Sequence, residues 1–274
     1  MVGFHKLESF WKIEYEAETL EPFITQATSE EAKEEVDSIL SKKLPKTLLD
    51  SVPLVMGDRA VITGNAVKGV FRHVLSAQLT EAGHEVCVQE VKLPKPKKSK
   101  EDKEKLIPEG RKEQCTPEDP CFVCMWFGTA SMQGALYFSF LKSSDAIKEI
   151  LLEEPIPMIA VDDKTKAVAE RAFLLIAPVK EGTKFVGWIT GENLSEEIIG
   201  AIKEVVDMSK KGFIKFGGYR TRGYGTVKFE IKKLTKYSTV PFKKEFEYEG
   251  EKLSEFLNNC QEKYHEYLTK NKKE

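Results

Sequence analysis

The sequence lacks long runs of apolar residues, and its first residues lack a basic segment followed by an apolar one. A helix that crosses a bilayer needs about 20 consecutive apolar residues. A secretory leader needs an apolar core behind basic residues. These absences predict a protein that has no membrane partner and is located in the cytoplasm.

Histidine is also scarce. The four histidines, at positions 5, 73, 84 and 265, are scattered along the chain. RNA cleavage by paired imidazoles and hydrolysis by a Ser/His/Asp triad both require positioned histidines, so neither chemistry is favoured. Net charge is small as well, at -2, with a pI near 6.2. This balance argues against indiscriminate coating of DNA, and any nucleic-acid site must be a local basic patch.

The composition is that of a globular protein. Of 274 residues, 41% are apolar and 31% are charged, enough to bury a substantial core beneath a charge-rich surface. We interpret residues 1–274 as one elaborated domain with an inserted lobe at 88–124 and a C-terminal helical extension at 240–274. Residues 88–113 contain nine basic and six acidic residues and three prolines, a composition that cannot build a core.

Periodicity predicts the main elements. Apolar and polar residues alternate between Trp11 and Leu20, the period of a strand with one buried face. Helical periodicity marks 28–44, 65–79, 195–212 and 252–268, and shorter apolar runs predict strands at 128–141, 157–160, 171–176 and 185–190.

The most distinctive stretch lies between two short apolar runs, 213–216 and 226–231, which are predicted to be strands. It contains four glycines, two arginines and two tyrosines, namely Gly217, Gly218, Tyr219, Arg220, Arg222, Gly223, Tyr224 and Gly225. Glycine lets backbone N–H groups approach anions, arginine binds phosphates and tyrosine stacks on bases. The stretch therefore predicts a site for single-stranded nucleic acid. A glycine-rich hairpin with a solvated basic face is the alternative.

The helix predicted at 65–79 has a second basic pair. Lys68 and Arg72 are four residues apart near its start, where unpaired backbone N–H groups also favour anions. The pair is a second candidate for phosphate binding. The alternative is two solvated cations on an ordinary amphipathic helix.

Cysteine usage suggests a metal. Of five cysteines, Cys115, Cys121 and Cys124 lie close together, and Cys87 or His84 can supply a fourth ligand. Four such ligands suit a structural zinc ion, which would clamp both ends of the inserted lobe. Buried cysteines without a ligand are the alternative.

Four segments resemble a known family. They are 62–72 (I-T-G-N-A-V-K-G-V-F-R), 119–128 (D-P-C-F-V-C-M-W-F-G), 134–139 (G-A-L-Y-F-S) and 216–225 (F-G-G-Y-R-T-R-G-Y-G). In order and spacing they resemble the RAMP superfamily of CRISPR-associated proteins, particularly the backbone subunits of type III interference complexes. The family patterns are P-G-S-S-L-K-G-x-x-R, D-P-x-C-x-x-F-G and G-G-x-x-x-R-G-Y-G.

The resemblance implies an α+β fold with a ferredoxin-like or RNA-recognition-type core. It also implies a guide RNA bound through the glycine-rich loop and through Asn65, Lys68 and Arg72. The expected partners are a target RNA, other RAMP subunits and a large effector subunit.

In many such subunits an aspartate cleaves the target RNA with a divalent metal, magnesium or manganese. Asp50 is the best match to this aspartate, in D-S-V-P-L-V-M. An extra residue precedes the proline and no arginine follows it. Three interpretations stay open: a subunit that cleaves through Asp50, a non-catalytic RNA-binding subunit, and a stand-alone RNA-binding protein stabilised by zinc.

Overall fold

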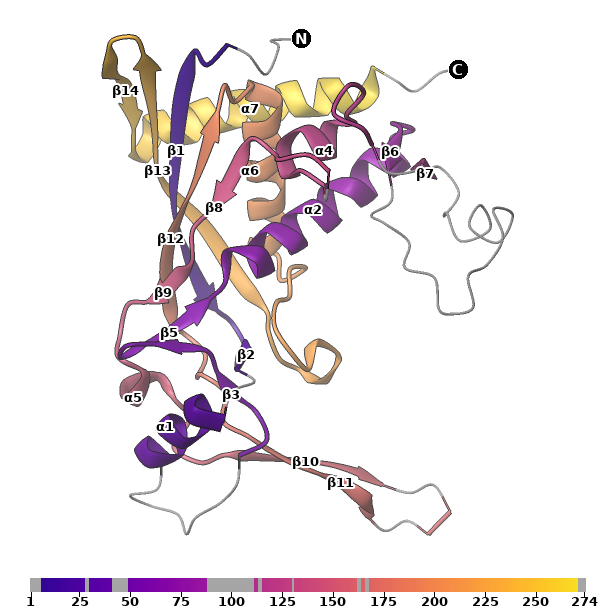
Figure 1. Ribbon diagram of the computed structural model, residues 1–274, viewed down its shortest axis with the longest axis vertical. Coiled ribbons are helices and arrows are strands. Elements are labelled where there is room, and N and C mark those ends of the chain that lie inside the picture. Colours follow the sequence, from indigo (N-terminus) through magenta and orange to yellow (C-terminus); the bar gives the residue numbers. More distant parts are fainter. Residues whose placement is uncertain are drawn as a thin grey trace.

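An antiparallel sheet forms the centre of the molecule, with helices packed on it (Figure 1). The computed structural model describes residues 6–27, 30–40, 49–87, 111–112, 115–129, 131–161, 164–165 and 168–270. This mixture of helices and antiparallel strands confirms the expected α+β fold.

Strands and helices are interspersed along the described part of the chain. The strands are β1 (Ser9–Thr19), β2 (Gln26–Ala27), β3 (Val52–Pro53), β4 (Val55–Met56), β5 (Arg59–Ile62), β6 (Val86–Cys87), β7 (Arg111–Lys112), β8 (Leu136–Phe138), β9 (Leu141–Ser143), β10 (Ile156–Val161), β11 (Val168–Ile176), β12 (Lys184–Glu192), β13 (Val227–Thr239) and β14 (Phe242–Tyr248). The helices are α1 (Glu30–Leu40), α2 (Gly64–Glu81), α4 (Phe122–Phe127), α5 (Ile147–Ile150), α6 (Glu196–Lys210) and α7 (Gly250–Thr269), with a 3₁₀ turn, η1, at Arg220–Arg222.

The main sheet is centred on β1. Its order is β14-β13-β1-β12-β9-β5-β4, and β8 also pairs with β12. Along β1 every second side chain is buried, as the alternation in the sequence predicts. The buried set faces α6 and α7, where Trp11 stacks on Phe256 of α7 with ring centroids 6.4 Å apart.

One aromatic cluster joins α2, the sheet and the glycine-rich loop. Phe229 of β13 lies 5.6 Å from Phe71 of α2 and 5.2 Å from Phe216, measured between ring centroids. All three side chains are almost fully buried. This packing places α2 and the glycine-rich loop on the same side of the sheet.

A two-stranded arm, β10–β11, projects from the end of the molecule opposite α7 (Figure 1). At its base, Met158 and Ile176 pack with Ile24 and Tyr224 in a second small core. The arm is thereby joined to the glycine-rich loop.

Several predicted boundaries change. The strand predicted at 128–141 is replaced by a loop, β8 and the start of β9, because Gly128 and Gly134 pack against each other and interrupt regular pairing. The strand predicted at 213–216 is reduced to a single bridge between Lys215 and Thr226.

The ends of the chain and the inserted lobe are described in part. Residues 242–269 supply β14, at the edge of the main sheet, and α7, whose Leu253, Leu257 and Tyr264 lie in the main core. Of the predicted lobe at 88–124, residues 88–110 and 113–114 lie outside the described residues, as do parts of the helix predicted at 28–44. Among the helices that are described, none is both long enough and apolar enough to cross a membrane.

Candidate nucleic acid groove and metal centre

A groove of about 650 Å³ separates the first half of α2 from the glycine-rich loop. The two segments that carry the candidate phosphate-binding residues, α2 and the glycine-rich loop, both contribute to it. Its lining from α2 consists of Asn65, Ala66, Gly69, Val70, His73 and Val74. The other side consists of Arg220 and Thr221 from the glycine-rich loop, and of Phe213, Ile214 and Lys215 from the run that precedes the loop. Two segments about 150 residues apart in the chain therefore form one concave surface, which is the geometry that a bound strand of nucleic acid requires.

The loop arginines carry the available charge of this surface. Arg220 and Arg222 are exposed on η1, and neither forms an ion pair within the described part of the chain. Lys215, in contrast, is paired with Glu21 at 2.9 Å. Hydrogen bonds from Thr226 and then Lys215 lower the pKa of Glu21. Glu21 thus holds the base of the loop, and the two arginines at its tip stay available for an anionic ligand.

The glycines of the loop differ in why, or whether, the structure requires glycine at their positions. Gly217 has a φ of +74°, and a Cβ there would lie 2.2 Å from the carbonyl oxygen of Ile24. Gly225 has a φ of +88°, and its Cβ would lie 2.1 Å from the carbonyl oxygen of Phe216. Both positions require glycine because backbone approaches backbone. Gly223 has a φ of +82° but open space around it.

Some glycine N–H groups are already used by the fold. The Gly218 amide donates to Ile24 at 3.0 Å, and the Gly225 amide donates to Pro22 at 3.1 Å. The expectation that the loop glycines present their N–H groups to anions therefore does not apply to these two, because the amides fasten the loop to the segment after β1.

The two loop tyrosines differ in exposure. Tyr224 is only 8% exposed and packs in the small core with Ile24 and Ile176. Its burial raises the pKa of its hydroxyl. Tyr219 is partly exposed, lies in the left-handed region and contacts Tyr224 edge-on, with centroids 6.1 Å apart. Of the pair, Tyr219 is the one that a base can reach.

The basic pair on α2 lies away from the groove. Arg72 is 9% exposed; its guanidinium donates to the Gly128 carbonyl and, at 3.4 Å, to the sulfur of Cys124. Lys68 is partly buried, and burial together with the charge of Arg72 lowers its pKa. Neither residue lines the groove. The guanidinium of Arg72 is turned toward the cysteines, so the expectation that it contacts a phosphate receives no support here.

Of the eleven residues that line the groove, the sequence had indicated only Asn65 and Arg220 as RNA-binding; Gly69, His73 and Phe213 are among those it missed. Phe213 is 72% exposed, although its apolar run was interpreted as a strand. The lysines and glycine around it were the available signal, because an aromatic residue among cations can stack on a base.

The other motifs interlock around α2. A Cβ on Gly64 would lie 2.2 Å from the carbonyl oxygen of Phe138, and one on Gly134 would lie 2.4 Å from the amide nitrogen of Gly128. Phe138 also packs against Phe71, with centroids 6.0 Å apart. The motifs at 62–72, 119–128 and 134–139 therefore form one contact network beside the groove.

A cluster of four cysteines lies on the other side of α2. The sulfurs of Cys87, Cys115, Cys121 and Cys124 are all buried and all lie within 4.8 Å of one another. A tetrahedral zinc site requires sulfurs about 3.8 Å apart, given zinc–sulfur bonds of about 2.3 Å. Cys87 and Cys124 are 3.1 Å apart. The four thiols can therefore hold a metal such as zinc after small adjustments.

Of the two candidates for a fourth ligand, the geometry favours Cys87, because Cys87 belongs to the cluster. His84 does not; its ring stacks on Tyr267 with centroids 4.7 Å apart, and its Nε2 lies 3.1 Å from the Tyr267 carbonyl oxygen. Within the thiol cluster, hydrogen bonds with Cys124 and Cys87 lower the pKa of Cys121. Burial raises the pKa of Cys115 to about 11.

The comparison with protein families agrees with the motifs. The family model of the RAMP superfamily matches residues 16–228, more than three quarters of the chain. The chain belongs to the RAMP superfamily. Membership indicates a CRISPR-associated, RNA-binding protein. The residues that line the groove and the four clustered cysteines all lie inside the matched region. Among curated proteins, no match to the chain was found.

Asp50, the expected RAMP aspartate, lies at the base of the β10–β11 arm. Its Oδ2 accepts a hydrogen bond of 2.6 Å from the Leu175 amide, and its own amide donates to the Leu175 carbonyl. The residue is exposed but does not line the groove.

Magnesium or manganese at Asp50 finds no support. Within the described ranges, the four cysteines are the only group of three or more His, Cys, Asp or Glu residues placed to hold a metal. A lone carboxylate is an incomplete site for a hard divalent cation, so no metal step is derived for Asp50.

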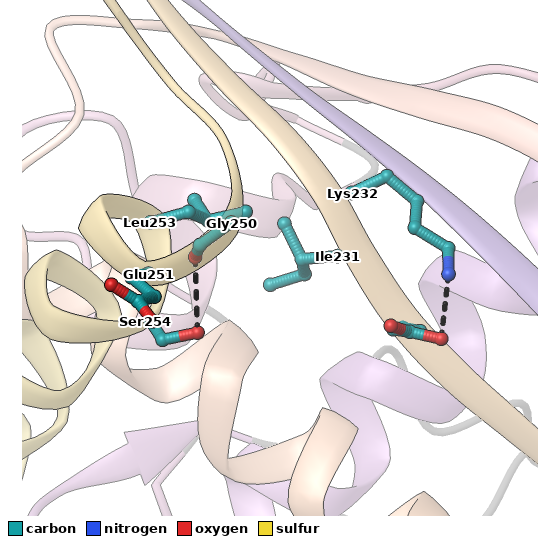
Figure 2. A pocket seen from close by; sticks show the side chains of 7 residues that line it. Ile231, Lys232, Gly250, Glu251, Leu253 and Ser254 are labelled. Carbon is teal, nitrogen blue, oxygen red and sulfur yellow. Dashed lines mark hydrogen bonds and ion pairs between the residues drawn. The ribbon is translucent and has the colours of Figure 1, made fainter.

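A second hollow, of about 550 Å³, lies where α7 begins beside β13 (Figure 2). Its one lysine, Lys232, is paired with Glu230 at 2.7 Å, and Ser254 donates to the Gly250 carbonyl at 3.2 Å. With Glu251 also in the lining, this hollow lacks the unpaired cations of the groove.

Proposed function

We propose that this RAMP protein is a guide-RNA-binding backbone subunit of a type III CRISPR effector complex. In such an assembly it binds a guide RNA beside other RAMP subunits and a large effector subunit, and the guide pairs with a target RNA. The observation that carries the proposal is the single groove formed by α2 and the glycine-rich loop, with Arg220 in its wall.

The groove offers what a ribose-phosphate strand needs. Arg220 supplies charge inside the groove and Arg222 supplies charge on the same 3₁₀ turn. Asn65 supplies an amide at the beginning of α2, where backbone N–H groups favour anions. Phe213 and Tyr219 are aromatic surfaces that a splayed base can stack on. None of these contacts reads base identity, because guide sequence is read by pairing with its target.

The cysteine cluster has a structural role in this proposal. Cys87 directly precedes the inserted lobe and the other three cysteines lie in its last ten residues, and β6, before the lobe, pairs with β7 inside it. A zinc ion held by the four thiolates closes the lobe at its base and reduces the entropy of ordering its ends. No chemistry on RNA is assigned to this ion.

The decisive test is binding of a single-stranded guide RNA by an Arg220→Ala/Arg222→Ala variant. Losing two phosphate contacts should weaken affinity about tenfold or more and reduce the slope of log affinity against log salt by about 1.4. The matched control is Lys243→Ala/Lys252→Ala, which removes two exposed cations, one in β14 and one at the start of α7, that do not line the groove. Equal affinities and slopes in the two variants would place the RNA elsewhere.

Assembly is tested separately, by purification from native extract. A backbone subunit should co-purify with guide RNA, other RAMP proteins and a large subunit. Recovery of the protein alone, with zinc and with affinity for RNA, would favour a stand-alone zinc-stabilised RNA-binding protein.

The second candidate function is cleavage of the paired target RNA. It rests on Asp50, whose carboxylate is exposed and held in position by the Leu175 amide. An Asp50→Asn subunit, assembled in the complex, should retain guide binding and lose target cutting. Unchanged cutting at every magnesium and manganese concentration would eliminate Asp50 as the catalytic residue.

A further inference from the structure

We propose that Arg72 is a positioning residue of the metal centre, where it donates a charge-assisted hydrogen bond to the metal-bound Cys124 thiolate and couples that centre to the RNA-binding helix. The inference rests on the metal site of the proposed function. It assigns to Arg72 a role other than the RNA contact that the family pattern implies.

The geometry places Arg72 between two elements. Its Nη2 lies 3.4 Å from the Cys124 sulfur, a normal distance for N–H···S, and its Nη1 donates to the Gly128 carbonyl. Cys124 is inside α4 and Gly128 directly follows it. One guanidinium therefore donates hydrogen bonds both to the metal-binding helix and to the turn that ends it. Lysine cannot reproduce this pair of bonds, because it lacks the planar fork of donors.

Charge gives the second argument. Four thiolates around a divalent ion carry a net charge of about -2, and burying that charge without compensation is costly. The other hydrogen bonds to the cluster sulfurs among the described residues have neutral donors: the Cys121 amide donates to Cys115 at 3.2 Å, the backbone amides of Cys87 and Cys124 donate to Cys121, and the thiols of Cys87 and Cys124 contact each other. Among the described residues, Arg72 is thus the charged donor in direct contact with the cluster.

The third argument is the position of Arg72 on α2. Asn65, Gly69 and His73 line the groove, and Arg72 points to the cysteines from another face of the same helix. Fixing Arg72 on the metal centre fixes the rotation of α2, and with it the direction in which the groove residues project. Outer groups that hydrogen-bond a metal ligand tune and orient the site in this way in other metalloproteins.

The test compares Arg72→Met with Lys68→Met in the full chain. Lys68 is the matched control because it is a cation one turn away on the same helix. Zinc affinity is measured by chelator competition. Loss of the hydrogen bond should weaken zinc binding about 10- to 100-fold in Arg72→Met, whereas Lys68→Met should stay within about twofold of the wild type.

Cobalt(II) substitution supplies a readout that a merely structural residue would not move. A thiolate without its hydrogen bond is a better electron donor, so the sulfur-to-cobalt charge-transfer band should shift to lower energy in Arg72→Met. If that variant does not fold, Arg72→Lys decides: a shifted band supports the inference and an unshifted band overturns it. Wild-type zinc affinity in Arg72→Met, or equal weakening in both Met variants, would also overturn it.

The failures can be told apart. Wild-type protein that binds neither zinc nor cobalt would remove the metal site itself. Wild-type protein that binds zinc but not guide RNA would remove the proposed function and leave the role of Arg72 to be judged by the metal measurements alone.

Discussion

Arg72 and Arg220 are the same residue type in two motifs of one family, yet the structure uses them in opposite ways. Arg72 is buried and bonded to Gly128 and Cys124, whereas Arg220 is exposed in the wall of the groove. A basic residue in a family pattern can thus serve the fold or the ligand. The role of the residue depends on whether its side chain is already hydrogen-bonded within the fold.

The largest loss of stability is expected when candidate metal ligands are removed. Cys121→Ser/Cys124→Ser should lose bound zinc and lower the free energy of unfolding by about 4 kcal/mol, since metal loss is among the most destabilising changes. Metal analysis and denaturant unfolding measure the two effects. Cys260→Ala, outside the cluster, should keep the metal and cost about 1 kcal/mol. Full metal content in the double variant would contradict the site.

The two arginines can be compared directly through stability. Arg72→Met should lower the free energy of unfolding by about 3 kcal/mol, because it leaves buried acceptors unsatisfied. Arg220→Met should change it by less than about 0.5 kcal/mol, because the side chain is exposed. Urea unfolding with matched metal content checks both values. Equal costs would abolish the distinction on which the comparison depends.

The glycine-rich loop contains glycines that are packed against other backbone and glycines that have open space around them. Substitution by alanine distinguishes the two kinds. Gly217→Ala should destabilise by about 2 kcal/mol or more, because positive φ and a backbone clash act together. Gly223→Ala shares the positive φ but has open space, and should cost about 1 kcal/mol. Thermal unfolding of the pair measures the difference, and an equal loss would show that conformation alone, without the contact to Ile24, explains the glycine.

The smallest effect is expected at the base of the loop, from Glu21. Its pKa is lowered in the folded state by Thr226 and Lys215, so its stabilisation is complete above the unfolded-state pKa and is lost as pH falls through the folded value. The pair is partly exposed, which limits its contribution to about 1 kcal/mol.

Unfolding at several pH values tests this. Wild type should be more stable than Glu21→Gln at about pH 6, and the difference should vanish near about pH 3. A difference that grows on acidification would have the wrong sign.

Local pattern predicted the elements whose burial follows one period. The alternation between Trp11 and Leu20 predicted β1, and the helical periodicity at 195–212 predicted α6. Pattern failed where glycines bring distant backbones together. The run at 128–141 has strand composition, but the contact between Gly128 and Gly134 interrupts it.

The candidate site divides in the same way. Cysteine spacing indicated three candidate metal ligands, and the composition of the glycine-rich loop, together with the resemblance to RAMP proteins, predicted an RNA-binding role for that loop. The choice between Cys87 and His84 could not be made from sequence, because the two residues lie three positions apart and only packing shows which of them faces the cluster.

The sequence by itself determined the α+β character, the family and the residue types of both sites, since these follow from period, motif order and ligand chemistry. Tertiary structure alone decided which cations face the groove. Lys68 and Arg72 occupy one stripe of α2, and a helix pattern gives the angle between side chains but not the direction in which the helix is turned. Packing of Phe71 on Phe229 sets that direction, directing Arg72 to the cysteines and leaving the groove to Arg220.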